Sequence, residues 1–392
     1  MGTAKNLTGK EEIREFQIFN KPAGPRCNLS CNYCYYLDKL EQYDGKIIPM
    51  PDDLLDSVIK QQIDASNGTV VTFSWHGGEP LLAGIEFYRK AVDLQKKHCP
   101  EGKRIVNGIQ TNGTLLNEAW CEFLSHEKFI VGISIDGPDK YHDMHRKGKD
   151  GNGTFQKVIK AWDLMSVYDM DPEILCVLNS FNASSPLEIY RFFKHLGASY
   201  ITFIPLVEQI TGTSKVSARS VTPEKFGDFL CTVFDEWCAY DIGKVKVQIF
   251  EEALRSAFGQ GHTLCVFKPV CGGVPVLEHN GDFFCCDHYV DSHHRIGNIK
   301  EITISKMLDS DLQHAFGLSK KSTLPPFCLK CEVLELCNGE CMKNRFTVTP
   351  EGDAGLNYLC EGYRKFFNHC KPFIHAVKKV YRGAENASQR GS

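Results

Sequence analysis

The feature that most constrains the fold is a regular alternation of short apolar runs with longer helical patterns. The apolar runs predict six strands, at Phe16–Asn20, Val70–Trp75, Asn107–Gln110, Val131–Ile135, Ile174–Leu178 and Ile201–Ile204. Helical periodicity lies between them, at Asp52–Ala65, Ile85–Lys97, Glu118–Ser125, Phe155–Tyr168 and Leu187–Leu196. Strands that alternate with helices predict parallel βα units. We therefore expect an α/β fold whose sheet forms an open or partial barrel.

A doubly wound dinucleotide-binding sheet would show the same alternation. Its first strand is followed by a G-x-G-x-x-G pattern, which gives a pyrophosphate room to approach the backbone. Here Cys27, Cys31 and Cys34 follow the first predicted strand instead.

Two later segments carry a helix-start signal, a hydroxyl residue before a proline, at Ser185-Pro186 and Thr222-Pro223.

The texture of the chain changes after about Tyr240. From Cys265 onward cysteines, glycines and short β-like pieces dominate, so this region is expected to be held by metal rather than by packing alone. A length of 392 residues also favours two domains. We predict an N-terminal tail (1–15), a barrel domain (16–245), a smaller cysteine-rich, loop-rich domain (246–381) and a disordered polar tail (382–392).

Cysteine usage and charge bound the class of protein. The chain has 18 cysteines and no apolar stretch at its N-terminus typical of a secretory signal, so its thiols are expected to serve metal or catalysis in the cytoplasm. The net charge is −3 without a long basic run, which argues against nucleic acid as a partner. The apolar stretches are too short to cross a membrane.

The first cysteine group, Cys27-x3-Cys31-x2-Cys34, has two chemical interpretations. Three thiolates can hold three irons of a [4Fe–4S] cluster and leave the fourth iron open. A zinc site is the alternative, although it needs a fourth ligand and the next histidine is distant, at His76. Polar or glycine-rich segments follow the next three strands, at 75–80, 110–113 and 134–137. Together these strand ends predict a ligand-binding face.

This pattern resembles the radical S-adenosylmethionine (SAM) superfamily. The resemblance rests on the three cysteines, on Tyr33 before the third cysteine, and on Gly77-Gly78-Glu79-Pro80. It implies that SAM caps the open iron and is cleaved to a 5′-deoxyadenosyl radical. It also implies SAM contacts at Tyr36, Gly78, Ser134, Arg146 and Val207, with Ser134 and Arg146 on the carboxylate.

The second cysteine group lies in the C-terminal region. Its pattern is Cys271-x9-Gly281-x4-Cys286, then Cys328-x2-Cys331-x5-Cys337-x3-Cys341, then Cys360. Four of these cysteines could form one zinc site, whereas eight, counting Cys265, suit two four-thiolate sites. The spacing resembles the SPASM domain, which implies two auxiliary [4Fe–4S] clusters, three clusters in all. The ligand sets would be Cys265, Cys271, Cys286 and Cys341, and Cys328, Cys331, Cys337 and Cys360. The other seven cysteines are interpreted as core residues.

Within this superfamily the chain most resembles anaerobic sulfatase-maturating enzymes, from about Phe19 to Tyr381. The resemblance implies oxidation of a Cys or Ser in a C/S-x-P-x-R motif of a nascent or unfolded sulfatase to Cα-formylglycine. Asp287 would be the base and His76 a substrate contact. A flavodoxin or ferredoxin would supply electrons. The alternatives are a related enzyme that makes a thioether or carbon–carbon crosslink, and a non-catalytic zinc-binding interaction module.

Overall fold

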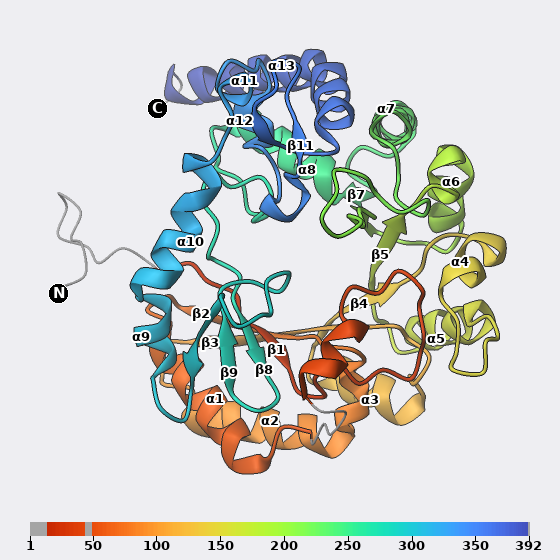
Figure 1. Ribbon diagram of the computed structural model, residues 1–392. Coiled ribbons are helices and arrows are strands. Elements are labelled where there is room, and N and C mark those ends of the chain that lie inside the picture. Colours follow the sequence, from red (N-terminus) through yellow and green to blue (C-terminus); the bar gives the residue numbers. More distant parts are fainter. Residues whose placement is uncertain (1–13, 44–48, 391–392) are drawn as a thin grey trace.

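Six parallel strands form the centre of the protein, and helices cover their outer face (Figure 1). The computed structural model describes residues 14–43 and 49–390. The strands are β1 (Phe19–Lys21), β2 (Val70–Trp75), β3 (Arg104–Thr111), β4 (Ile130–Ser134), β5 (Glu173–Leu178) and β6 (Tyr200–Pro205). Each strand pairs in parallel with the next along the chain. The predicted partial barrel is therefore confirmed.

The helices of this part follow the strands in sequence. They are α1 (Asp52–Ala65), α2 (Ile85–His98), α3 (Glu118–His126), α4 (Asp139–His145), α5 (Phe155–Val167), α6 (Pro186–His195), α7 (Pro223–Tyr240) and α8 (Gln248–Arg255). Thr222 caps α7 by accepting a hydrogen bond from the Lys225 amide, as its sequence predicts. The predicted cap at Ser185 is not made, because its hydroxyl accepts a hydrogen bond from Tyr141 instead.

The central sheet continues beyond the six predicted strands. On one side β7 (Lys246–Val247) pairs with β6, and on the other β8 (Val276–Glu278) pairs in parallel with β1. The antiparallel strands β9 (Asp282–Phe284) and β10 (Arg295–Asn298) complete a ten-stranded sheet. The β1–β8 register sets Lys21 opposite Glu278. The cysteine-rich region thus shares a sheet with the barrel, across the predicted domain boundary.

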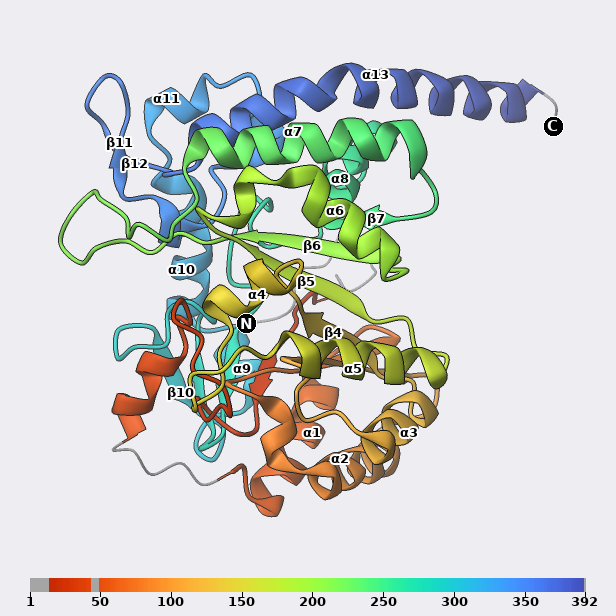
Figure 2. The ribbon, with the colours of Figure 1, turned by 90° about the vertical axis from the view of Figure 1, so that its right-hand side faces the viewer.

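The rest of the C-terminal region consists of short elements and loops, apart from two longer helices. The short elements are α9 (Ile304–Leu308), α11 (Pro326–Leu329), α12 (Leu334–Cys337), β11 (Thr347–Val348) and β12 (Ala354–Leu356). The two longer helices are α10 (Asp311–Ser322) and α13 (Cys360–Arg390). Single 3₁₀ segments lie at Leu37–Tyr43, Pro80–Ala83, Asn182–Ser184, Ser256–Phe258 and Met342–Asn344. Helices α7 and α13 lie side by side (Figure 2). No helix among the described residues is long and apolar enough to span a membrane.

Helix α13 differs from the sequence prediction at its end. Residues from Arg382 were expected to be disordered because they are polar, yet the helix continues to Arg390. Alanine, glutamate, glutamine and arginine in this segment are good helix formers, and they extend a helix that is already nucleated. Of the predicted N-terminal tail, residues 1–13 lie outside the described part of the chain.

Candidate active site

The loop after β1 carries Cys27, Cys31 and Cys34, all with free and partly exposed thiols. The loop is held against the segment that follows α4, because the amide of Ser30 donates to the carbonyl of Lys147 at 2.8 Å. Burial raises the pKa of Cys27 to about 11 and that of Cys31 to about 12. Thiolates in this loop therefore need a cationic partner, which iron would provide.

The Gly77–Pro80 segment after β2 packs directly beneath the cysteine loop. The amide of Gly78 donates to the carbonyl of Gly24 at 2.9 Å. A Cβ atom at Gly78 would lie 2.1 Å from the carbonyl oxygen of Arg26, so only glycine fits here. Glu79 is fully buried and accepts hydrogen bonds from Leu81, Thr111 and Asn112. It thereby ties the ends of β2 and β3 together.

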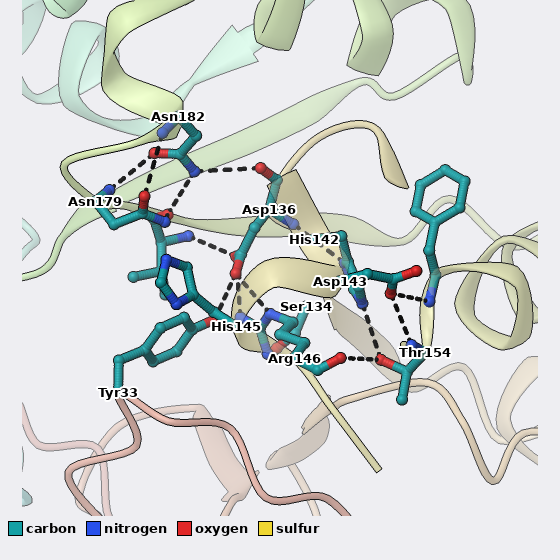
Figure 3. A network of polar contacts seen from close by, with 12 residues as sticks. Tyr33, Ser134, Asp136, His142, Asp143, His145, Arg146, Thr154, Asn179 and Asn182 are labelled. Atoms are coloured by element: carbon teal, nitrogen blue, oxygen red, sulfur yellow. Dashed lines mark hydrogen bonds and ion pairs between the residues drawn. The ribbon is translucent and has the colours of Figure 1, made fainter. Parts of the chain in front are cut away.

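A buried ion pair between Arg146 and Asp136 contacts the cysteine loop through Tyr33 (Figure 3). Arg146 donates through Nε and Nη2 to the two carboxylate oxygens of Asp136, at 2.9 and 3.1 Å. The Tyr33 hydroxyl also donates to Asp136, and the Arg146 guanidinium lies 5.5 Å from the Tyr33 ring centroid. From the sequence, Asp136 was expected only to belong to the segment that follows the fourth predicted strand. Its carboxylate in fact occupies one edge of the Arg146 fork.

The other residues expected to contact SAM lie at strand ends of the same sheet. Ser134 ends β4, and its hydroxyl accepts a hydrogen bond from Gln110 on β3 at 3.2 Å. Val207 follows β6 and is buried. The structure thus brings Gly78, Ser134 and Arg146 to the loops around the cysteines, and their contacts with SAM stay predictions.

A second polar centre surrounds Lys21, the last residue of β1. Lys21 is 1% exposed, and its Nζ lies 2.5 Å from Oδ1 of Asp287. The Tyr35 hydroxyl donates to Oδ2 of the same carboxylate. Burial alone would raise the pKa of Asp287, but Lys21, His288 and the hydrogen bond from Tyr35 outweigh it and hold that pKa below its usual range. Asp287 is therefore ionised near neutral pH.

Tyr36 and His76 flank this ion pair. The Lys21 ammonium lies 4.4 Å from the Tyr36 ring centroid, and the Tyr36 hydroxyl donates to Glu278 on β8. The His76 ring stacks on Phe19 with centroids 4.1 Å apart. Burial, and then the charge of Lys21, lower the pKa of His76 to about 3, so its imidazole is neutral. Three predicted site residues, Tyr36, His76 and Asp287, thus share one centre.

The sequence analysis did not identify Lys21, Tyr35 or Glu278 as members of this centre. A lysine at the end of an apolar strand was the one available signal for Lys21, since a charge there needs a buried partner. The other two residues could not be found, because their positions depend on the β1–β8 pairing.

The C-terminal cysteines gather in two places. Cys328, Cys331, Cys337 and Cys360 line one apolar cavity. Around Cys286, burial raises the pKa of its thiol well above the usual value, and the thiols of Cys341 and Cys265 raise it further. Burial likewise raises the pKa of Cys265 to about 11, with Cys271 as the next contribution. These are the two sets of four that the SPASM resemblance implies.

The structure also separates Cys286 from its neighbour Cys285. Cys285 is fully buried, and the charges that act on its thiol include Asp291 but no other cysteine. Five of the seven cysteines interpreted as core residues are buried, namely Cys121, Cys176, Cys231, Cys285 and Cys370. Among the described residues, no three Cys, His, Asp or Glu side chains are placed to hold a single metal ion.

Comparison with known proteins decides the family. Residues 22–193 match the model of the radical SAM superfamily, and residues 271–332 match the iron–sulfur cluster-binding domain SPASM. A serine-type anaerobic sulfatase-maturating enzyme of Bacteroides thetaiotaomicron is 42% identical over 377 residues, which cover 92% of this chain and 91% of that protein. The chain belongs to the family of anaerobic sulfatase-maturating enzymes. It is therefore a radical SAM enzyme with a SPASM domain.

Two further members of the family show how broad the match is. A cysteine-type anaerobic sulfatase-maturating enzyme of Clostridium perfringens is 34% identical, and the match covers 90% of this chain and 95% of that protein. The solved structure described as native anSMEcpe with bound AdoMet superposes with a TM-score of 0.85 at 32% identity, covering 93% of this chain and 99% of that one. The relatives thus include both serine and cysteine types.

Proposed function

We propose that this enzyme oxidises a Cys or Ser side chain in a C/S-x-P-x-R motif of a nascent or unfolded sulfatase to Cα-formylglycine. Support comes from the names of the relatives, and from a solved relative that holds AdoMet together with a Cp18Cys peptide. The observation that carries the proposal is the buried, ionised Asp287, which directly follows the predicted cluster ligand Cys286.

The residues present fit SAM and iron–sulfur clusters. Three thiols share the loop after β1, Gly78 allows the segment after β2 to pack closely against that loop, and eight further thiols form two groups of four. We propose Cys27, Cys31 and Cys34 as ligands of the SAM-binding cluster, with the two C-terminal sets as ligands of the auxiliary clusters. When bound, these groups would supply a radical that removes a hydrogen from the substrate Cβ and an acceptor for the electron released.

The protein's own residues would then handle the proton. A substrate carbon that has lost a hydrogen and an electron carries a strongly acidic S–H or O–H, so even a weak base can accept its proton. Asp287 suits this step because Lys21 and Tyr35 hold its carboxylate in place and keep it ionised. The neutral His76 lies beside it and would orient the substrate thiol or hydroxyl, while Tyr36 remains a proposed contact of SAM.

Incubation with a peptide that contains Cys-x-Pro-x-Arg tests this proposal. The protein is reconstituted anaerobically and given SAM and a flavodoxin or ferredoxin as electron donor. Both donors are proteins of the cytoplasm, where we propose that this enzyme acts. Oxidation of the cysteine removes two hydrogens and leaves a thioaldehyde, which water hydrolyses to formylglycine with release of hydrogen sulfide. The resulting aldehyde reacts with a hydrazide. A crosslink would remove two hydrogens but keep the sulfur, and that product would overturn the proposal in favour of a crosslinking enzyme.

A further inference from the structure

Lys320 is a fully buried cation that forms no ion pair with a carboxylate among the described residues. It lies on α10 with a side chain that is 0% exposed, and its Nζ donates to the carbonyls of Cys265 at 2.8 Å and Val266 at 2.7 Å. Within the part of the chain that the structure describes, no carboxylate oxygen lies within 4.0 Å of this ammonium. The groups that act on its charge include the thiols of Cys271 and Cys265 and, without direct contact, the carboxylate of Glu340.

Arg345 is a second cation of the same kind. Its guanidinium donates to four backbone carbonyls, those of Lys320, Asn338, Gly339 and Glu340 at 2.6, 2.8, 2.8 and 3.3 Å. Among the described residues, no carboxylate forms an ion pair with Arg345. The thiols of Cys328, Cys337 and Cys271 act on its charge, and these belong to both predicted ligand sets. Arg345 therefore lies between the two groups of cysteines.

The turn that Arg345 holds joins the two groups. Asn338, Gly339 and Glu340 have φ values of 45°, 69° and 52°, so three successive residues adopt the left-handed conformation. Two of them carry side chains, for which this conformation is strained. The turn leads from Cys337 of one predicted set to Cys341 of the other, and hydrogen bonds from Arg345 keep it in place.

Lys320 is fully buried and Arg345 is half-buried, and both need a negative partner because an unpaired charge is costly to remove from water. The buried carboxylate of Glu340 acts on both cations, but it forms an ion pair with neither, and its Oε2 accepts hydrogen bonds from Asn344 and Asn357. One carboxylate leaves the two positive charges only partly balanced. A [4Fe–4S] cluster bound by four thiolates carries a net negative charge, and nearby charge is one of the factors that set its reduction potential. The cysteines around Lys320 and Arg345 would therefore hold the missing anions.

We propose that Lys320 and Arg345 are the countercharges of the two auxiliary clusters and raise their reduction potentials, so that the clusters accept the substrate's electron more readily. This inference rests on the auxiliary clusters of the proposed function. It assigns positioning and tuning roles to two residues that do not touch the substrate.

Potentiometric titration followed by electron paramagnetic resonance tests the proposal. The full chain carries Ala at Cys27, Cys31 and Cys34, so that only the auxiliary sites bind clusters, and it is reconstituted anaerobically to about eight irons. In this background K320Q should shift at least one potential downward by 59 mV or more, a ten-fold change in the ratio of oxidised to reduced cluster. K320R keeps the charge, and K321Q changes the neighbouring exposed lysine. Both should leave the potentials unchanged.

The outcomes separate charge from packing. Full iron content with unshifted potentials in K320Q would overturn the countercharge role. Loss of iron from K320Q alone would support it, whereas loss from both K320Q and K320R would overturn it, because packing and not charge would then be responsible. If the background protein binds zinc in place of about eight irons, the proposed cofactor set itself fails together with this inference.

Discussion

The ion pair between Lys21 and Asp287 allows stability and catalysis to be separated by mutation. At 2.5 Å the gross attraction of the two charges is about 7 kcal/mol at an effective dielectric constant of about 20. Both side chains are buried, so removing either partner should leave an uncompensated charge and cost about 3–5 kcal/mol of unfolding free energy. Lys21→Met and Asp287→Asn should each destabilise the protein by this amount.

The double variant K21M/D287N should recover most of the lost stability, because no unpaired charge remains. Anaerobic urea unfolding followed by circular dichroism measures the coupling, which should be several kcal/mol. Activity should behave differently. D287N and the double variant should lose about 10²–10⁴-fold in peptide oxidation, while K21M keeps the carboxylate and should retain more activity than either.

Two results would refute this reasoning. Additive losses of stability in the double variant would show that the two charges do not depend on each other in the folded protein. Peptide oxidation by D287N at a rate near that of the wild type, with SAM cleavage also intact, would show that Asp287 is not the base.

Three further predictions concern the clusters and the strand ends. Iron analysis of the reconstituted wild-type protein should find about 12 irons. Cys286→Ala should lower this number by about four, whereas Cys285→Ala should leave it unchanged, and equal losses in the two variants would contradict the ligand assignment. Gly78→Ala should displace the cysteine loop, because its Cβ meets the Arg26 carbonyl, and should lower both iron content and SAM binding; wild-type SAM affinity would count against this packing. Burial raises the pKa of Glu79 to about 7, above about 4.3 when unfolded, so its contribution to stability should fall as pH rises between these values. Urea unfolding at pH 5.5 and 8 should show a smaller fall for Glu79→Gln, and an equal fall would refute the assignment.

Local patterns predicted the barrel well. Strand β2 and helix α1 have the predicted bounds, because apolar runs and helical periodicity are written in neighbouring residues. The start of β1 was placed too early. Residues before Phe19 follow the C-terminal region instead, as the hydrogen bond from the Gln17 amide to the carbonyl of Gly273 shows.

Long-range pairing was the part that the sequence could not reveal. Strand β8 has only three residues, and nothing in Val276–Glu278 indicates that it pairs with β1. The SPASM resemblance, rather than spacing, implied which thiols gather, since spacing alone would group Cys341 with Cys328, Cys331 and Cys337. The buried partners of charges, such as Asp136 for Arg146 and Lys21 for Asp287, come from distant segments and became visible only in the folded chain.

Because β1 is hydrogen-bonded to β2 on one edge and to β8 on the other, the barrel cannot be cut from its C-terminal partner cleanly. A chain ending before Val276 would expose the open edge of β1, a template for aggregation, at the strand that carries Lys21. The two regions therefore cannot be exchanged independently. Replacing the cysteine-rich part with that of another enzyme would also replace β8, the strand that pairs with the edge of β1.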